Sequence, residues 1–155
     1  MAQKKTAMEY AILLLGLRAY STAELKKKLY AKEYSAAEIS QVIQECTRHG
    51  FLNDEHYAEN LAAAVYARGG GKRKAIQKLR TKGIDSEVIK ETLAEKEDGN
   101  VMSELEAATG ALARKASAFA REPDPRKRRE KALRFLAGRG FSAQVAYEAL
   151  RKLAM

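Results

Sequence analysis

Three short stretches of this 155-residue chain decide its fold, because they follow one pattern. They read Leu29-Tyr-Ala-Lys32-Glu-Tyr34-Ser35, Leu79-Arg-Thr-Lys82-Gly-Ile84-Asp85 and Leu136-Ala-Gly-Arg139-Gly-Phe141-Ser142. Each stretch holds a leucine, a base three residues later, a turn residue, a large apolar residue and a helix N-cap, and the leucines are 50 and 57 residues apart. Each closes one helix and opens the next, so the pattern predicts three copies of one helical unit.

Capping residues divide the chain into short helices. Ser21 with Glu24, and Ser35 with Glu38, have the spacing of a capping box, in which each side chain bonds an amide at the start of the helix. Further expected N-caps are Asn53 or Asp54, Asp85 and Ser142, and the expected helix stops are Gly50, Gly83 and Gly140. Between these marks apolar residues recur every three or four positions, as one narrow stripe per helix. The stretch of residues 102–119 keeps a helical face until Pro123 and Pro125 interrupt it.

Composition supports an all-α fold. The chain holds 28 Ala but only 17 Val, Ile and Thr together, a balance that favours helices over strands. We expect about nine short helices in three tandem three-helix repeats, at residues 1–52, 53–99 and 100–155. Short helices can bury their stripes within one unit while neighbouring units share only a modest contact, so the molecule should be elongated and curved.

Several classes of protein are excluded. The single cysteine, Cys46, cannot form an internal disulfide, which favours a reducing cytoplasm. The longest apolar run, residues 11–17, has seven residues against the roughly 20 that span a membrane, so no membrane association is expected.

The sequence suggests a phosphate-binding loop and a metal site, but the residues present fit neither. Gly69, Gly70, Gly71 and Lys72 are reminiscent of a phosphate loop, but Arg73 follows in place of Ser or Thr, so a flexible corner between helices is the preferred interpretation. Cys46, His49 and His56 would make at most three ligands for a metal ion, and Cys46 continues an apolar stripe. No catalytic set is present, and we expect no enzyme, metal or cofactor.

Charge indicates the kind of partner instead. The net charge is +9, and residues 111–155 alone carry 12 basic and 4 acidic side chains. Such an excess attracts polyanions. The candidate binding residues are Lys26, Lys27, Lys28, Lys72, Arg73, Lys74, Arg126, Lys127, Arg128, Arg129, Arg134 and Arg139. They fall in the corresponding helix of each unit and would form one intermittent stripe if the units stack, although each cluster taken singly is also compatible with a solvated helix face.

Four segments resemble the RecX family, the small regulators of the RecA recombinase. They are Ala11-x-x-x-Leu15-x-x-Arg18-x-Tyr20-Ser21-x-x-Glu24-Leu25-x-x-Lys28-Leu29, Gly50-Phe51-Leu52-Asn53-Asp54-x-x-Tyr57-Ala58, Lys82-Gly83-Ile84-Asp85 and Arg129-x-Lys131-x-x-x-Phe135-Leu136-x-x-Arg139-Gly140-Phe141-Ser142. The resemblance covers nearly the whole chain. It implies three tandem three-helix repeats and a protein that lies along the groove of the RecA filament on single-stranded DNA. That protein would restrain strand exchange and ATPase activity in homologous recombination, DNA repair and the SOS response.

The chain departs from the family pattern at three places. Asn53 stands where the family usually has an acid, Glu33 replaces a usual glycine, and the connection at residues 68–72 is short. We expect a monomer that binds the RecA filament, with weak, sequence-independent contact to single-stranded DNA. A stand-alone nucleic-acid-binding protein and an adaptor for another acidic protein are the alternatives.

Overall fold

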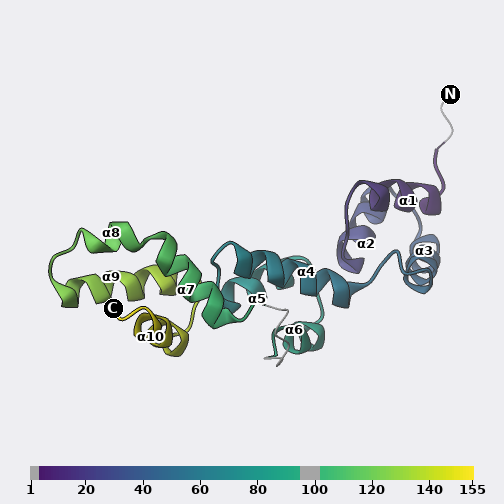
Figure 1. Ribbon diagram of the computed structural model, residues 1–155. Helices are drawn as coiled ribbons and strands as arrows, with labels where there is room; N and C mark the ends of the chain where they lie inside the picture. The colour runs from purple at the N-terminus through teal and green to yellow at the C-terminus, as the bar shows by residue number, and fades with distance from the viewer. Residues whose placement is uncertain (1–3, 95–101) are drawn as a thin grey trace.

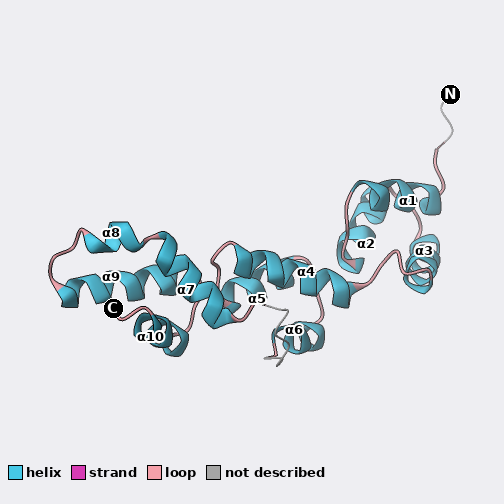
Figure 2. Ribbon diagram, in the orientation of Figure 1, coloured by secondary structure: helices cyan, strands magenta, loops and turns pink. Residues whose placement is uncertain are grey.

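The protein is an elongated array of helices (Figure 1). The computed structural model describes residues 4–94 and 102–155, and within these residues there are ten helices and no strand (Figure 2). The first unit comprises α1 (Ala7–Leu17), α2 (Thr22–Ala31) and α3 (Ala36–Arg48), and the second comprises α4 (Asp54–Ala67), α5 (Lys72–Thr81) and α6 (Ser86–Leu93). The third comprises α7 (Glu104–Arg114), α8 (Ala116–Ala120), α9 (Pro125–Gly138) and α10 (Ala143–Lys152). The all-α prediction is confirmed.

Local signals set the helix ends as the sequence predicts. Ser21 and Ser35 both form complete capping boxes, with each hydroxyl 3.1 Å from the amide three residues on. Asn53, Asp85 and Ser142 cap α4, α6 and α10. The glycines that follow α3, α5 and α9 have φ of 77°, 73° and 92° at Gly50, Gly83 and Gly140. Glu33 adopts the same left-handed conformation, with φ 65°, so the departure from the family pattern there concerns a strained position.

The expected long helix over residues 102–119 is divided in two. The chain leaves helical geometry at Lys115, with φ −105° and ψ 7°, and α8 begins at the next residue. This change places the ring of Phe119 against Phe135 of α9, with 5.7 Å between the ring centroids and an edge-to-face arrangement. The third unit therefore has four helices, because packing of this aromatic pair prevails over the helical propensity of an Ala-rich segment.

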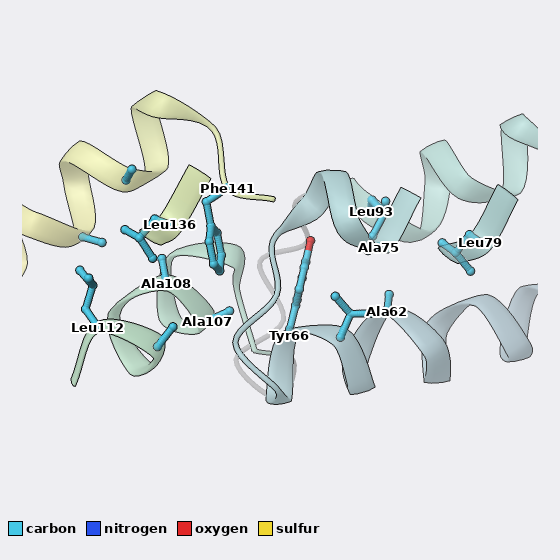
Figure 3. Close-up of a cluster of buried hydrophobic side chains, with 14 of the residues drawn as sticks. Ala62, Tyr66, Ala75, Leu79, Leu93, Ala107, Ala108, Leu112, Leu136 and Phe141 are labelled. Carbon is cyan, nitrogen blue, oxygen red and sulfur yellow. The ribbon is translucent and has the colours of Figure 1, made fainter. Parts of the chain in front are cut away.

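The buried side chains form two cores. Unit 1 has its own, built from residues such as Leu25, Leu29, Ile39 and Cys46. Units 2 and 3 share a second core, in which Leu79 of α5 and Leu136 of α9 belong to one cluster. Figure 3 shows Tyr66, at the end of α4, and Phe141, after α9, lying where the two units meet.

Units 2 and 3 are thus connected by buried residues, whereas unit 1 has a separate core, and across the boundary between units 2 and 3 the main helix contact is that of α4 with α7. The expected division after residue 52 falls between α3 and α4. The division after residue 99 lies outside the described residues.

Candidate polyanion-binding surface

The predicted basic residues lie on the next-to-last helix of each unit, α2, α5 and α9, and these helices follow one another along the molecule (Figure 1). At the first joint the hydroxyl of Ser21, the N-cap of α2, donates to the carbonyl of Lys82, the C-cap of α5, at 2.6 Å. At the second, the amide of Gly71, the N-cap of α5, donates to the carbonyl of Arg139, the C-cap of α9, at 2.8 Å. The paired positions are equivalent in the repeat. The same contact thus joins α9, α5 and α2 end to end, N-terminus against C-terminus, where helix dipoles attract.

The second joint is closely packed. The amide of Arg73 donates to the carbonyl of Gly140 at 3.1 Å, and a Cβ atom added at Gly71 would lie 2.5 Å from that carbonyl oxygen. Gly71 is buried. The glycine run at residues 69–71 is the predicted corner between α4 and α5, and at Gly71 it brings the backbones of units 2 and 3 into contact.

The first joint is polar. The amide of Thr22 donates to the carboxylate of Asp54 at 2.8 Å, across the boundary between units. The Glu24 carboxylate accepts from the Arg18 guanidinium at 3.2 Å and from the Lys82 ammonium at 3.3 Å. The buried residues of units 1 and 2 belong to separate cores. These hydrogen bonds and ion pairs therefore stabilise the contact between the two units.

Glu24 is the electrostatic centre of this joint. Burial alone would raise the pKa of its carboxyl, but hydrogen bonds from the Ser21 amide, Arg18, Tyr57 and Lys82 lower that pKa to about 2. Burial, followed by the hydrogen bond to Glu24, raises the pKa of Tyr57 to about 12. The carboxylate is therefore ionised and fully engaged at neutral pH.

A groove of about 430 Å³ opens beside the first joint. It is lined by Arg18, Ala23, Glu24, Lys27, Lys28, Ala31, Thr81, Lys82 and Gly83, so four cations and one carboxylate face it. A second groove of about 380 Å³ follows the surface of α5 and is lined by Arg73, Ile76, Gln77, Arg80 and Thr81. Thr81 lines both, so the two grooves adjoin at this residue; together they are named here the α2–α5 track.

The predicted residues of α2 and α5 are brought to this region, but in different turns of their helices. Residues 26–28 lie in the middle of α2 and are exposed, whereas Lys72, Arg73 and Lys74 form the first turn of α5. Lys74 is half-buried against Gly140 at the second joint. The two clusters therefore occupy the same helix of their units but not the same position in the repeat.

The predicted residues of α9 have two kinds of surroundings. Four of them, Arg126, Lys127, Arg129 and Arg134, are exposed. Arg128 is half-buried and donates to the carbonyls of Glu122 and Pro123, at 3.1 and 3.4 Å. Arg139 donates to the carbonyl of Arg68 at 3.4 Å and lies over the Phe135 ring. Arg128 and Arg139 thus stabilise a loop and a joint, respectively.

Three basic residues of the α2–α5 track were not among the predicted site residues: Arg18, Arg80 and Lys82. Arg18 and Lys82 are 64 positions apart in the chain and meet only through Glu24. Arg80 and Lys82 stand in a basic run that continues from Lys72, and that run was the available signal. Nothing local to Arg18 marks it as part of a charged groove.

Cys46, His49 and His56, which the sequence analysis considered and rejected as metal ligands, do not form a metal site in the structure. Cys46 is fully buried in the core of unit 1, and this burial raises the pKa of its thiol. The His49 ring lies 3.5 Å from the carboxylate of Glu45. Over residues 4–94 and 102–155 no group of three or more potential ligands is gathered as a metal site would require. No helix in those same residues is long and apolar enough to cross a membrane.

The fold and its joints define an all-helical tandem-repeat protein with a basic track along α2 and α5 and further exposed cations on α9. Three family models match in chain order: RecX first three-helix domain at residues 7–46, second at residues 53–93 and third at residues 103–150. The chain belongs to the RecX family.

Relatives and solved structures agree with this assignment. The chain is 36% identical to the regulatory protein RecX of Pelodictyon phaeoclathratiforme, over 96% of this chain and 89% of the relative. It is 34% identical to that of Trichlorobacter lovleyi, over 92% of each. A crystal structure of RecX from Lactobacillus salivarius has the same fold, with a TM-score of 0.84 over 96% of this chain and 94% of that one, at 20% identity. These relatives are named regulatory proteins, and none carries an enzyme name.

Proposed function

We propose that this protein regulates the RecA recombinase by lying along the groove of the RecA filament on single-stranded DNA, as a monomer in the cytoplasm. Units at residues 1–52, 53–99 and 100–155 would contact successive RecA protomers and so restrain strand exchange and ATP hydrolysis. DNA repair, recombination and the SOS response are the processes that this activity would serve.

One observation carries the proposal: α2, α5 and α9 are joined end to end by an equivalent contact at both joints. An extended row of helices with cations on its surface suits a long polyanionic assembly better than a small substrate. Contacts that are individually weak gain avidity when they are linked in one molecule. The predicted site residues that remain exposed, such as Lys127, Arg129 and Arg134, are the proposed contacts on α9.

The test is co-sedimentation with RecA filaments, together with RecA ATPase rates. The triple variant Lys127→Ala/Arg129→Ala/Arg134→Ala should bind filaments at least ten-fold more weakly, because α9 loses three exposed cations. Arg128 is retained in this variant since it stabilises the loop before α9. A control, Lys90→Ala/Arg151→Ala/Lys152→Ala, removes three exposed cations from α6 and α10 and should bind nearly as well as the parent.

Two results would contradict the proposal. Equal inhibition of the RecA ATPase by the parent and the α9 variant would remove α9 from the interface. Tighter binding of the parent to naked single-stranded DNA than to RecA-coated DNA would instead identify a stand-alone nucleic-acid-binding protein.

A further inference from the structure

We propose that the groove between α2 and the end of α5 binds the phosphodiester backbone of single-stranded nucleic acid, and that an occupied groove fixes unit 1 against unit 2. This inference deepens the proposed function and rests on it for the source of the strand. It assigns the DNA contact to one joint of the array rather than to its basic surface as a whole.

The lining of the groove suits phosphates rather than bases. Four cations and one carboxylate face it, a net charge of +3. Its other lining residues are Ala23, Ala31, Thr81 and Gly83, so no aromatic ring is available there for a base to stack on. A backbone phosphate needs only positive charge and room to approach, and small side chains provide that room.

The four cations are arranged in two pairs. Arg18 and Lys82 are held by the same carboxylate, that of Glu24, one from unit 1 and one from unit 2. Lys27 and Lys28 have no ion pair or side-chain hydrogen bond with any residue that the structure describes, and both are exposed. Two cations are thus free to bind an anion, and two more are already positioned beside them.

The groove continues along α5. Arg73, Gln77 and Arg80 are spaced by four and three residues, so they share one face of the helix. Arg73 and Arg80 are seven residues apart, which corresponds to about 10 Å at roughly 1.5 Å per residue. This length lets the face follow a short stretch of a strand's phosphate backbone and contact it at both arginines. We expect a strand that enters beside Lys27 to pass Thr81, which lines both grooves, and to reach this face of α5.

Occupancy of the groove would also change the joint. Units 1 and 2 have separate cores, and cations from both line the groove: Lys27 and Lys28 from α2, Lys82 from the end of α5. In the empty groove Lys27 and Lys28 repel Lys82, and this repulsion opposes the attraction of the Glu24–Lys82 ion pair across the joint. A bound phosphate would remove that repulsion and link the two units, so we expect a strand to narrow the range of angles between them.

The test compares two charge-matched variants. Lys27→Gln/Lys28→Gln removes the two unpaired cations of the groove, and Lys90→Gln/Lys152→Gln removes two exposed cations from α6 and α10. Binding of a fluorescein-labelled oligodeoxythymidylate is measured by anisotropy over a salt series. The groove variant should lose at least ten-fold in affinity, and its salt dependence should fall by about 1.4 in slope, at roughly 0.7 per phosphate contact. The control should lose less than three-fold.

A second measurement reports on the joint. Spin labels at Gln44→Cys in α3 and Glu87→Cys in α6 give the distance distribution between units 1 and 2 by pulsed electron resonance, while native Cys46 stays buried. Saturating oligonucleotide should narrow this distribution in the parent protein but not in the groove variant. An unchanged distribution in the parent would overturn the linkage.

The remaining outcomes separate this inference from the proposed function. Equal loss of oligonucleotide affinity in the two variants would overturn the groove as a site, even if the parent still sediments with RecA filaments. Conversely, a parent that binds oligonucleotide through the groove but ignores RecA filaments would support the groove and contradict the proposed function. Displacement of the strand by inorganic phosphate or ATP at equal phosphate concentration would show a site for free phosphates and overturn the assignment to a nucleic-acid backbone.

Discussion

Replacing Gly71 with alanine should break the joint between units 2 and 3. The backbone at Gly71 is extended, with φ −97° and ψ −179°, so alanine meets no conformational penalty there. The added Cβ atom would lie 2.5 Å from the Gly140 oxygen and 2.6 Å from the Phe141 nitrogen, both of them backbone atoms. Relieving that overlap costs about 1–3 kcal/mol, and each of the two hydrogen bonds across the joint adds about 0.5–1.5 kcal/mol. We expect Gly71→Ala to lower the free energy of unfolding by about 3 kcal/mol.

The assay is urea unfolding followed by circular dichroism at 222 nm. Gly138→Ala is the matched control: Gly138 ends α9, and a Cβ atom added there has no atom within 4 Å. Alanine is the better helix former, so this variant should gain about 0.5–1 kcal/mol. Because unit 1 has its own core, the loss in Gly71→Ala should fall on the part of the transition that belongs to units 2 and 3. Parent-like stability of Gly71→Ala, or an equal loss in Gly138→Ala, would refute the reasoning.

Two further predictions concern the first joint. Ser21→Ala removes both a capping box and the hydrogen bond to Lys82, whereas Ser35→Ala removes a capping box alone. Ser21→Ala should therefore lower the free energy of unfolding in urea by about 1 kcal/mol more than Ser35→Ala does. Equal losses in the two variants would show that the hydrogen bond to Lys82 contributes nothing. Glu24 has a folded pKa of about 2, below its ordinary value of 4.5, so its contribution is complete above pH 4.5 and is lost as the pH falls toward 2. The stability difference between the parent and Glu24→Gln should therefore shrink by about 2 kcal/mol from pH 5 to pH 3, at about 1.4 kcal/mol per pKa unit; a constant difference would contradict this account of the joint.

Local chemistry explains why so much of the fold is predictable. A capping box needs only two side chains three residues apart, so Ser21 and Ser35 mark helix starts without knowledge of the rest of the molecule. A turn after a helix needs a left-handed residue, which Gly83 and Gly140 supply, and the repetition of this turn reveals the three units. The same reasoning did not find the break at Lys115, because that break depends on Phe119 meeting Phe135, a contact between helices.

The candidate site was predicted less completely because it is a property of the joints. Residues 26–28 and Arg73 were found as cations on helices, but Arg18 and Lys82 become neighbours only when unit 1 meets unit 2. Charge alone also could not separate Arg129, which is exposed, from Arg128, which donates to carbonyls of the preceding loop. A count of basic residues therefore indicates the class of partner, and the packing of units decides which of these residues can touch it.

Both joints place the N-terminus of one helix against the C-terminus of another, but different groups make the contact at each joint. We expect this difference to decide where the array bends. At the second joint Gly71 brings two backbones together, and the units bury a common core beneath them. At the first joint the equivalent position is Ser21, whose side chain replaces the backbone amide as donor, and ion pairs take the place of shared apolar contacts. Ion pairs and single hydrogen bonds contribute less than a continuous core and respond to salt and to bound anions. We therefore expect the array to bend more readily between units 1 and 2, where the cations of the α2–α5 track converge, than between units 2 and 3.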